Sequence, residues 1–134
     1  MKIMFTLKII MLLVVMALLS ACPGVDTSLP TVSADKVQNE LKPQSSMLIL
    51  DVRSPGEFRE GHVPGAINVP HQHINTVFDQ IKTHGKDKDI VVYCESGVRS
   101  SKAISVLLEN GFGNVYRMDG DMAQWRSQKR PLEK

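Results

Sequence analysis

The sequence has very little net charge and very little cysteine. Its 16 lysines and arginines stand against 14 acidic residues, which gives a formal net charge of +2 at pH 7. Because basic and acidic residues are nearly equal in number, nucleic acid is not expected to be the main partner, since phosphate backbones are bound by concentrated positive charge. Only Cys22 and Cys94 are present, so the chain can form at most one disulfide of its own. Internal repeats and low-complexity segments are also absent, which predicts one domain with an appendage.

No apolar run is long enough to cross a membrane. The run from Ile9 to Leu19 is far shorter than the roughly 20 apolar residues that a spanning helix needs. It follows a start with two lysines and no acid, and small residues come after it, which is the pattern of a secretory signal peptide. We therefore expect residues 1–21 to be a leader, residues 22–30 a flexible tether and residues 31–134 the domain.

The end of this leader, Leu19-Ser20-Ala21-Cys22, resembles the lipobox of bacterial lipoproteins. The resemblance implies cleavage before Cys22 and lipid attachment to its sulfur, and hence an extracytoplasmic, membrane-anchored protein that faces the periplasm. The alternatives are an ordinary leader that leaves Cys22 free and a disulfide between Cys22 and Cys94. If Cys22 is lipidated, Cys94 has no disulfide partner, and an unpaired cysteine in an oxidising compartment is expected to be used for its reactivity.

Strand-like and helix-like segments alternate along residues 31–134, and this alternation predicts an α/β fold with a mainly parallel sheet and helices on both faces. About five strands are expected, at residues 31–32, 47–50, 66–69, 89–93 and 115–118. Helices are expected over residues 34–41, 55–60, 75–82, 100–110 and 122–126. Ligands bind at the carboxyl ends of the strands in such sheets, and Cys94 and residues 51–53 lie at two of these ends.

The segment Tyr93-Cys94-Glu95-Ser96-Gly97-Val98-Arg99-Ser100 joins a strand to a helix. Cys94 stands just ahead of the helix N-terminus, where outward-pointing N–H groups and the helix dipole favour the thiolate over the thiol. Gly97 allows the loop to bend around the sulfur, and Arg99 offers a planar donor fork for loop carbonyls or an incoming anion. This pattern predicts that Cys94 is a nucleophile. The alternative is a strand-end cysteine that only packs.

Three stretches of the sequence together resemble single-domain rhodaneses, the sulfurtransferases that carry sulfane sulfur on a cysteine. They occur in the family's order: DVRSPGEFREGHVPGAINVP at 51–70, CESGVRS at 94–100 and DGDMAQW at 119–125. The resemblance implies a rhodanese-like three-layer fold. It also implies that Cys94 takes sulfur from thiosulfate, a persulfide or a polysulfide and passes it, as a persulfide, to a thiol, cyanide or a protein acceptor. No cofactor is implied.

The resemblance also assigns roles to the neighbours of Cys94. In the family, the backbone N–H groups of the loop cradle the charged outer sulfur, and the arginine position, here Arg99, braces that loop. The loop residues that match are Glu95, Ser96, Gly97, Val98, Arg99 and Ser100. Asp51 and Arg53 match a strand-end pair that we interpret as structural charges. The alternative for this pair is a solvated ion pair without a further role.

Two positions depart from the family pattern. Many thiosulfate-using members carry a basic residue directly after the cysteine, and here that residue is Glu95. An acidic neighbour disfavours negative charge on the sulfur and repels a dianionic donor, so we expect weak use of thiosulfate and better use of a less charged persulfide or polysulfide. Asp121 stands where the family often has a second glycine, and the sequence alone gives it no catalytic role.

The length of the cysteine loop bears on functions other than sulfur transfer. Phosphatases and arsenate reductases of related fold place five residues between the cysteine and the arginine, whereas four separate Cys94 from Arg99, and this smaller cradle suits one sulfur atom better than a tetrahedral oxyanion. A membrane-tethered persulfide carrier or binding module with little turnover would have the same sequence. His71 and His73 share a face if their segment is extended, but no third ligand is near, so we expect no metal.

Overall fold

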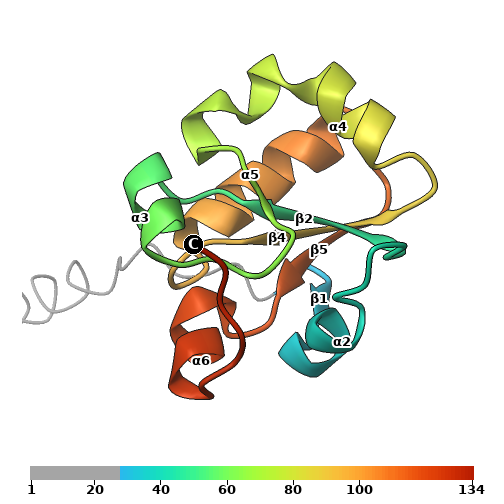
Figure 1. The fold of residues 1–134 in the computed structure, drawn as a ribbon. Helices are drawn as coiled ribbons and strands as arrows, with labels where there is room; N and C mark the ends of the chain where they lie inside the picture. Colours follow the sequence, from blue (N-terminus) through green and yellow to red (C-terminus); the bar gives the residue numbers. More distant parts are fainter. Residues whose placement is uncertain (1–27) are drawn as a thin grey trace, which may run out of the picture.

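The computed structural model describes residues 28–134, in which strands and helices alternate (Figure 1). The strands are β1 (Thr31–Val32), β2 (Met47–Asp51), β3 (Ile67–Asn68), β4 (Asp89–Tyr93) and β5 (Val115–Met118). The helices are α2 (Ala34–Asn39), α3 (Pro55–Glu60), the 3-10 helix η1 (His71–Thr76), α4 (Phe78–His84), α5 (Val98–Glu109) and α6 (Asp121–Ser127). None of these described helices is both long and apolar enough to span a bilayer. The expected leader, Cys22 and the tether as far as residue 27 lie outside the described residues.

The five strands form one sheet in the order β1-β5-β4-β2-β3, and every pairing is parallel. The predicted α/β fold with a parallel sheet is therefore confirmed. The strand β4 lies at the centre, with Tyr93 beside Asp51 of β2 and Val92 beside Arg117 of β5. Because parallel strands end at the same edge of a sheet, the residues that follow β2, β4 and β5 come together there.

Apolar side chains fill both faces of the sheet, as expected for buried parallel strands. Figure 1 shows α4 and α5 on one side of the sheet and α2 and α6 on the other. The first core joins the sheet to α5 through Leu50, Val92, Ala103, Ile104 and Leu107, among others. The second core packs Val37 of α2 and Met122 and Trp125 of α6 against Ile49, Val91 and Tyr93. Burial on both faces holds the central strand, and with it Cys94, in a fixed position.

Some element boundaries differ from those predicted. The helix expected over residues 75–82 is instead a 3-10 turn followed by α4, with Val77 between them at φ −123°, outside the helical range. The helix predicted from residue 100 begins at Val98, because Gly97 adopts a left-handed conformation at φ +101° and turns the chain directly into α5. The strand expected over residues 66–69 is shorter, since β3 pairs only with Leu50 and Asp51.

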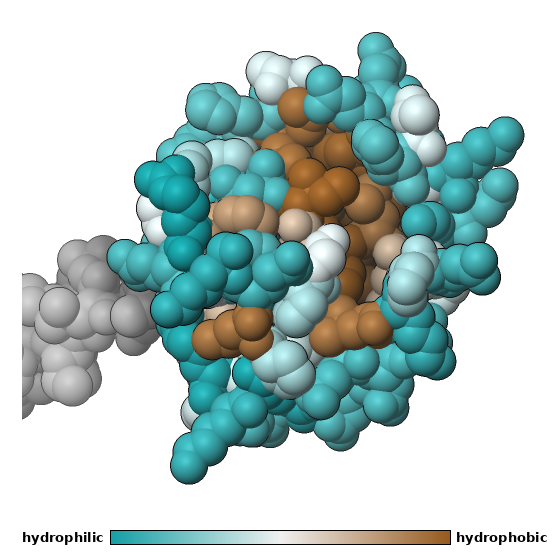
Figure 2. Space-filling model, in the orientation of Figure 1, coloured by the Kyte–Doolittle hydropathy of each residue, from teal (hydrophilic) through white to brown (hydrophobic). Residues whose placement is uncertain are grey.

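The short β3 leaves the first half of β2 uncovered at this edge of the sheet. Figure 2 shows apolar side chains gathered in a hollow there, between α4 and the sheet. The hollow has a volume of about 90 Å³ and its apolar lining is Leu48, Leu50, Ile67, Val69, Val77 and Ile81. It contains no nucleophile, so the chemistry must be sought at the carboxyl ends of the strands.

Candidate active site

Cys94 follows β4 directly and lies at the predicted strand-to-helix junction. Its side chain is free and only 1% exposed. The backbone N–H of Gly97 donates to Sγ at 3.1 Å, because the left-handed turn at Gly97 folds the loop back over the sulfur. The sulfur therefore lies inside the loop and accepts a hydrogen bond that would stabilise negative charge on it.

Other N–H groups of the loop are also available as donors. Those of Glu95, Ser96, Val98, Arg99 and Ser100 have no hydrogen-bond partner among the described residues. In the first turn of a helix this is expected, since no earlier carbonyl of the helix is available to them. Free N–H groups at a helix N-terminus make an anion site, and here they lie beside a cysteine.

Arg99 braces the loop from outside. Its guanidinium donates to both carboxylate oxygens of Glu57 in α3, at 2.7 and 2.8 Å. Glu57 also completes the predicted capping box of α3, because its Oε2 accepts from the N–H and the hydroxyl of Ser54 at 2.9 and 2.8 Å. The hydrogen bonds from Arg99 lower the pKa of Glu57 strongly, and those to Glu57 raise the pKa of Arg99. The arginine thus ties the loop to α3 and donates to no loop carbonyl.

Asp51 and Arg53 form a buried ion pair at the end of β2. Their exposed fractions are 0% and 1%, and Arg53 Nη2 lies 2.6 Å from Asp51 Oδ2, so the alternative of a solvated pair is wrong. Arg53 also donates to the carbonyl of Gly61 at 2.8 Å, and the hydroxyl of Tyr93 donates to Asp51 Oδ2 at 2.7 Å. Burial lowers the pKa of Arg53, but the hydrogen bonds and charge of Asp51 outweigh it and leave this pKa raised. Burial and Asp51 also raise the pKa of Tyr93.

Glu95 lies at the mouth of the loop and is paired with two arginines. Its carboxylate accepts a short hydrogen bond from Arg126 of α6, and its Oε2 lies 3.8 Å from Nη1 of Arg53. A cavity of about 400 Å³ adjoins these side chains, lined by Arg53, Glu57, Glu60, Gly61, Glu95, Arg126 and Leu132. The charge that we expected to repel a dianionic donor is therefore partly balanced by its neighbours.

The residue of this site that sequence reasoning missed is Asp121, at the start of α6. Its side chain is only 2% exposed, and its Oδ1 accepts from the N–H of Cys94 at 2.8 Å and from the hydroxyl of Ser100 at 2.9 Å. The hydroxyl oxygen of Ser100 in turn lies 3.5 Å from Sγ of Cys94. Burial raises the pKa of Asp121. One signal in the sequence could have pointed to it. Asp121 stands where the rhodanese pattern often has a glycine, just after the last strand and at the edge of the sheet where Cys94 lies.

His71 lies near the start of α5, where the cysteine loop ends. His71 is partly buried, and burial together with the charges of Arg99 and Lys102 lowers its pKa. His73 is exposed. Within residues 28–134, no group of three or more histidine, cysteine or acidic residues is arranged to hold a metal ion.

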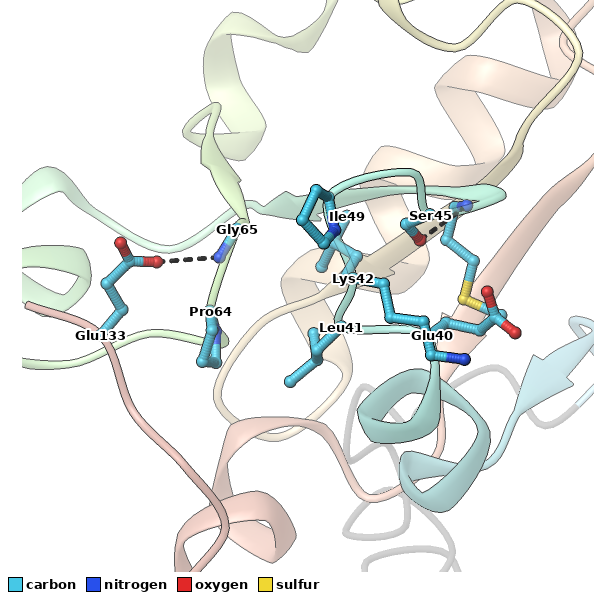
Figure 3. Close-up of a pocket in the computed structure, with 10 residues that line it drawn as sticks. Glu40, Leu41, Lys42, Ser45, Ile49, Pro64, Gly65 and Glu133 are labelled. Atoms are coloured by element: carbon cyan, nitrogen blue, oxygen red, sulfur yellow. Dashed lines mark hydrogen bonds between the residues drawn. The ribbon is translucent and has the colours of Figure 1, made fainter.

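Another cavity lies toward the amino end of β2, away from Cys94 (Figure 3). It has a volume of about 360 Å³ and is lined by Glu40, Leu41, Lys42, Pro43, Ser45, Met47, Ile49, Pro64, Gly65 and Glu133. Its visible polar contacts are structural, since the N–H of Gly65 donates to Glu133 at 2.9 Å and that of Met47 to Ser45 at 3.0 Å. Without a nucleophile or converging donors, this cavity is a weaker candidate than the loop around Cys94.

Sequence comparisons match the whole domain. The profile of the rhodanese-like domain covers residues 33–128. A protein named sulfurtransferase from Allochromatium vinosum is 30% identical over 101 residues, which are 75% of this chain and 92% of that relative. A tRNA uridine(34) hydroxylase from Buchnera aphidicola is 37% identical over 99 residues, but the match covers only 30% of the hydroxylase. The chain therefore corresponds to nearly all of the first relative and to less than a third of the second.

Solved structures share the fold. A rhodanese-related protein from Thermoplasma volcanium superimposes with a TM-score of 0.67 at 25% identity, over 78% of this chain and 97% of that one. A protein of unknown function from Rhodopseudomonas palustris, described as a possible tyrosine phosphatase, gives a TM-score of 0.70 at 26% identity, over 81% and 88%.

Proposed function

The chain belongs to the rhodanese-like domain family, and from this premise we propose that it is a sulfurtransferase that carries sulfane sulfur as a persulfide on Cys94. One observation carries the proposal. The sulfur of Cys94 accepts the Gly97 N–H at 3.1 Å, while the remaining N–H groups of the loop have no partner among residues 28–134. Unpaired N–H donors in the loop that carries the sulfur would favour negative charge on a second sulfur bound to the first.

The reaction would proceed in two displacements. The Cys94 thiolate attacks the outer sulfur of the donor, the bond between that sulfur and the rest of the donor breaks, and the remainder leaves with the electron pair. The outer sulfur, now bonded to Cys94, holds its negative charge among the loop N–H groups. A thiol or cyanide acceptor then attacks this outer sulfur and restores the Cys94 thiolate. Arg99, held by Glu57, keeps the loop in shape through both steps.

For the donor, we propose a persulfide or polysulfide in preference to thiosulfate. Glu95 places a carboxylate, 35% exposed, at the mouth of the loop, and a dianion would approach it directly. Arg126 and Arg53 balance part of this charge, so we expect thiosulfate to be a weak donor that is still used.

For the location, we propose that the protein is made with a leader, lipidated on Cys22 and held at a membrane on the extracytoplasmic side. The support is in the sequence: a basic start, a short apolar run and the lipobox-like Leu19-Ser20-Ala21-Cys22. We expect a radioactive or alkyne-tagged fatty acid to label the chain, and we expect Cys22→Ser to lose that label.

A persulfide carrier with little turnover is the second candidate. It would use the same Cys94 and the same loop, and its acceptor would be a partner protein. Phosphatase chemistry has less support, because Arg99 is engaged by Glu57 and only four residues separate it from Cys94. The tRNA hydroxylase relatives match this chain over only a part of their length, so nothing here extends their activity to it.

Intact-mass spectrometry of the purified protein tests the proposal. After incubation with polysulfide we expect a gain of about one sulfur atom, which cyanide removes and which Cys94→Ser does not show. A gain with polysulfide and a smaller one with thiosulfate would agree with the proposed donor preference. A stable gain without turnover on small acceptors would favour the carrier. No gain with either donor would overturn the proposed function.

A further inference from the structure

The carboxylate of Asp121 lies beneath the nucleophile, in contact with its backbone and with its neighbour Ser100. It is 2% exposed, and its other oxygen, Oδ2, lies 3.8 Å from Nε of Arg117 on β5. Arg117 is itself buried, and its Nε and Nη1 have no hydrogen-bond partner in the structure. Asp121 is therefore a buried carboxylate with a nearby positive charge, at a residue with a left-handed backbone.

A chain of contacts leads from the sulfur of Cys94 to this carboxylate. The thiol donates to the hydroxyl oxygen of Ser100 at 3.5 Å, and that hydroxyl lies 2.9 Å from Oδ1 of Asp121. A hydroxyl group can accept one hydrogen bond while it donates another, so Ser100 can connect the two groups. The carbonyl of Gly97, 3.1 Å from the same hydroxyl, is the competing acceptor.

We propose that Asp121 accepts the thiol proton of Cys94 through Ser100. The proton leaves Sγ for the oxygen of Ser100 as the hydroxyl proton of Ser100 passes to Oδ1 of Asp121. The S–H bond breaks, an O–H bond forms on the carboxyl group, and the electron pair of the S–H bond stays on sulfur. A thiol and a carboxylate become a thiolate and a carboxylic acid, so atoms and charge balance. Asp121 acts through Ser100 and is thus a positioning residue for the nucleophile.

The surroundings favour this exchange because it creates no additional charge in a buried place. One negative charge moves from Asp121 to the sulfur, where the Gly97 N–H and the free N–H groups of the loop receive it. The charged groups that face the pair are Arg117 from β5, Arg99 from the start of α5 and Glu95 from the loop. Burial also raises the pKa of Asp121, which makes its carboxylate a better proton acceptor.

The proton exchange supplies the thiolate for the first displacement and the proton for its leaving group, and the inference therefore rests on the proposed function. With a persulfide donor, the Cys94 thiolate attacks the outer sulfur of R–S–S⁻, and the R–S⁻ that leaves takes the proton back from Asp121 through Ser100. The sum is R–S–S⁻ plus Cys94–SH giving R–SH plus Cys94–S–S⁻, which needs no other reactant. The proton on Asp121 thereby assists the departure of the donor thiolate.

The test is the pH profile of Cys94 alkylation by iodoacetamide, which needs no sulfur donor. In the unaltered protein we expect the rate to rise in two steps, the lower one marking the loss of a proton from the pair that Cys94 and Asp121 form. Asp121→Asn keeps an acceptor oxygen for both hydrogen bonds but can neither take the proton nor hold a negative charge beside the sulfur, so a single step without an intermediate plateau should remain. Asp121→Gly, which suits the left-handed backbone at φ +48°, should behave in the same way.

Ser100→Ala and Asp119→Asn separate the proposal from simpler explanations. Ser100→Ala retains the carboxylate but removes the bridge, so both steps of the equilibrium profile should remain while persulfide formation with a persulfide donor slows. Asp119 is exposed in the same turn, and Asp119→Asn should leave both steps in place. A single step in the unaltered protein, or an unchanged profile in Asp121→Asn, would overturn the relay; so would persulfide formation in Ser100→Ala that is as fast as in the unaltered protein. Failure of persulfide formation with an intact two-step profile would instead contradict the proposed function alone.

Discussion

Arg99 and Glu57 face each other through two parallel hydrogen bonds, Nη1 to Oε2 at 2.7 Å and Nη2 to Oε1 at 2.8 Å. The first residue belongs to the helix after β4 and the second to the helix after β2. Since Glu57 also receives the N–H and hydroxyl of Ser54, one carboxylate caps α3 and anchors the cysteine loop. The shape of the loop therefore depends on a residue 42 positions away in sequence.

Substitution of Arg99 by lysine should slow sulfur transfer although the charge is retained. An ammonium group cannot make both parallel hydrogen bonds to Glu57, so the loop N–H groups lose their fixed geometry. We expect persulfide formation on Cys94 to slow by about tenfold or more, because misplacing a single preorganised donor can cost that much. Stopped-flow or quenched mass spectrometry measures this rate. Arg59→Lys, an exposed change on α3, is the control, and equal rates in the two variants would contradict the role of Arg99.

Reversal of the charge at Glu95 should improve the use of thiosulfate. Glu95→Arg removes the carboxylate that faces a dianionic donor, and we expect the KM for thiosulfate to fall several-fold, by about tenfold at low salt. Steady-state assays with cyanide as the acceptor measure it. Glu109→Arg makes the same change of charge at the far, exposed end of α5. The idea fails if Glu95→Arg shifts the KM no more than this control does.

Removal of the hydroxyl of Tyr93 should destabilise the fold. This hydroxyl donates to Asp51 at 2.7 Å and accepts from the N–H of Val63 at 3.1 Å, and all of these atoms are buried. Tyr93→Phe leaves the buried N–H of Val63 without a partner and removes one of the hydrogen bonds to Asp51, whose Oδ2 keeps those from Arg53, so we expect the free energy of unfolding to fall by about 1–3 kcal/mol. Urea denaturation measures the change. Tyr116→Phe, at a partly exposed position on β5, should cost much less, and equal losses would argue against the network.

The stability difference between Asp121→Asn and the unaltered protein should depend on pH. Burial raises the folded-state pKa of Asp121 above its unfolded value of about 3.9. A carboxyl group whose pKa is raised in the folded state contributes most to stability at pH values below its unfolded-state pKa. This contribution is lost as the pH rises through the folded-state pKa. Relative to the unaltered protein, Asp121→Asn should thus gain stability between pH 4 and pH 8. Thermal unfolding at several pH values measures this difference, and a constant difference would show that Asp121 has no raised pKa in the fold.

Much of the fold follows from local pattern. The alternation of segments predicted the parallel sheet, and Ser54 with Glu57 predicted the capping box at the start of α3. The segment from Asn75 was predicted less well. Its apolar spacing suits one helix, but the structure divides it at Val77, and this division depends on how η1 packs against α5, which sequence spacing does not contain.

The site was predictable only where one segment supplies it. The place of Cys94 and its loop between β4 and α5 followed from residues that are adjacent in the chain. The partner of Arg99 could not be found in this way, since it comes from another helix. Asp121 was harder still, because its role requires β5 to lie beside β4 and the turn after β5 to adopt a left-handed conformation at a residue other than glycine. Such contacts arise from strand order and not from local sequence.

The hydrogen bond from the Cys94 N–H to Asp121 has a consequence for the order in which the protein can be completed. Cys94 directly follows the central strand β4, but the acceptor of its N–H lies on α6, the last of the described helices. During synthesis, β4 and its loop leave the ribosome before α6, so the Cys94 N–H lacks this acceptor until α6 has been made and has packed against the sheet. Non-local contacts of this kind form late in folding. A nascent chain would thus carry a more exposed Cys94 until α6 is in place, which makes oxidation of that thiol a particular hazard during folding.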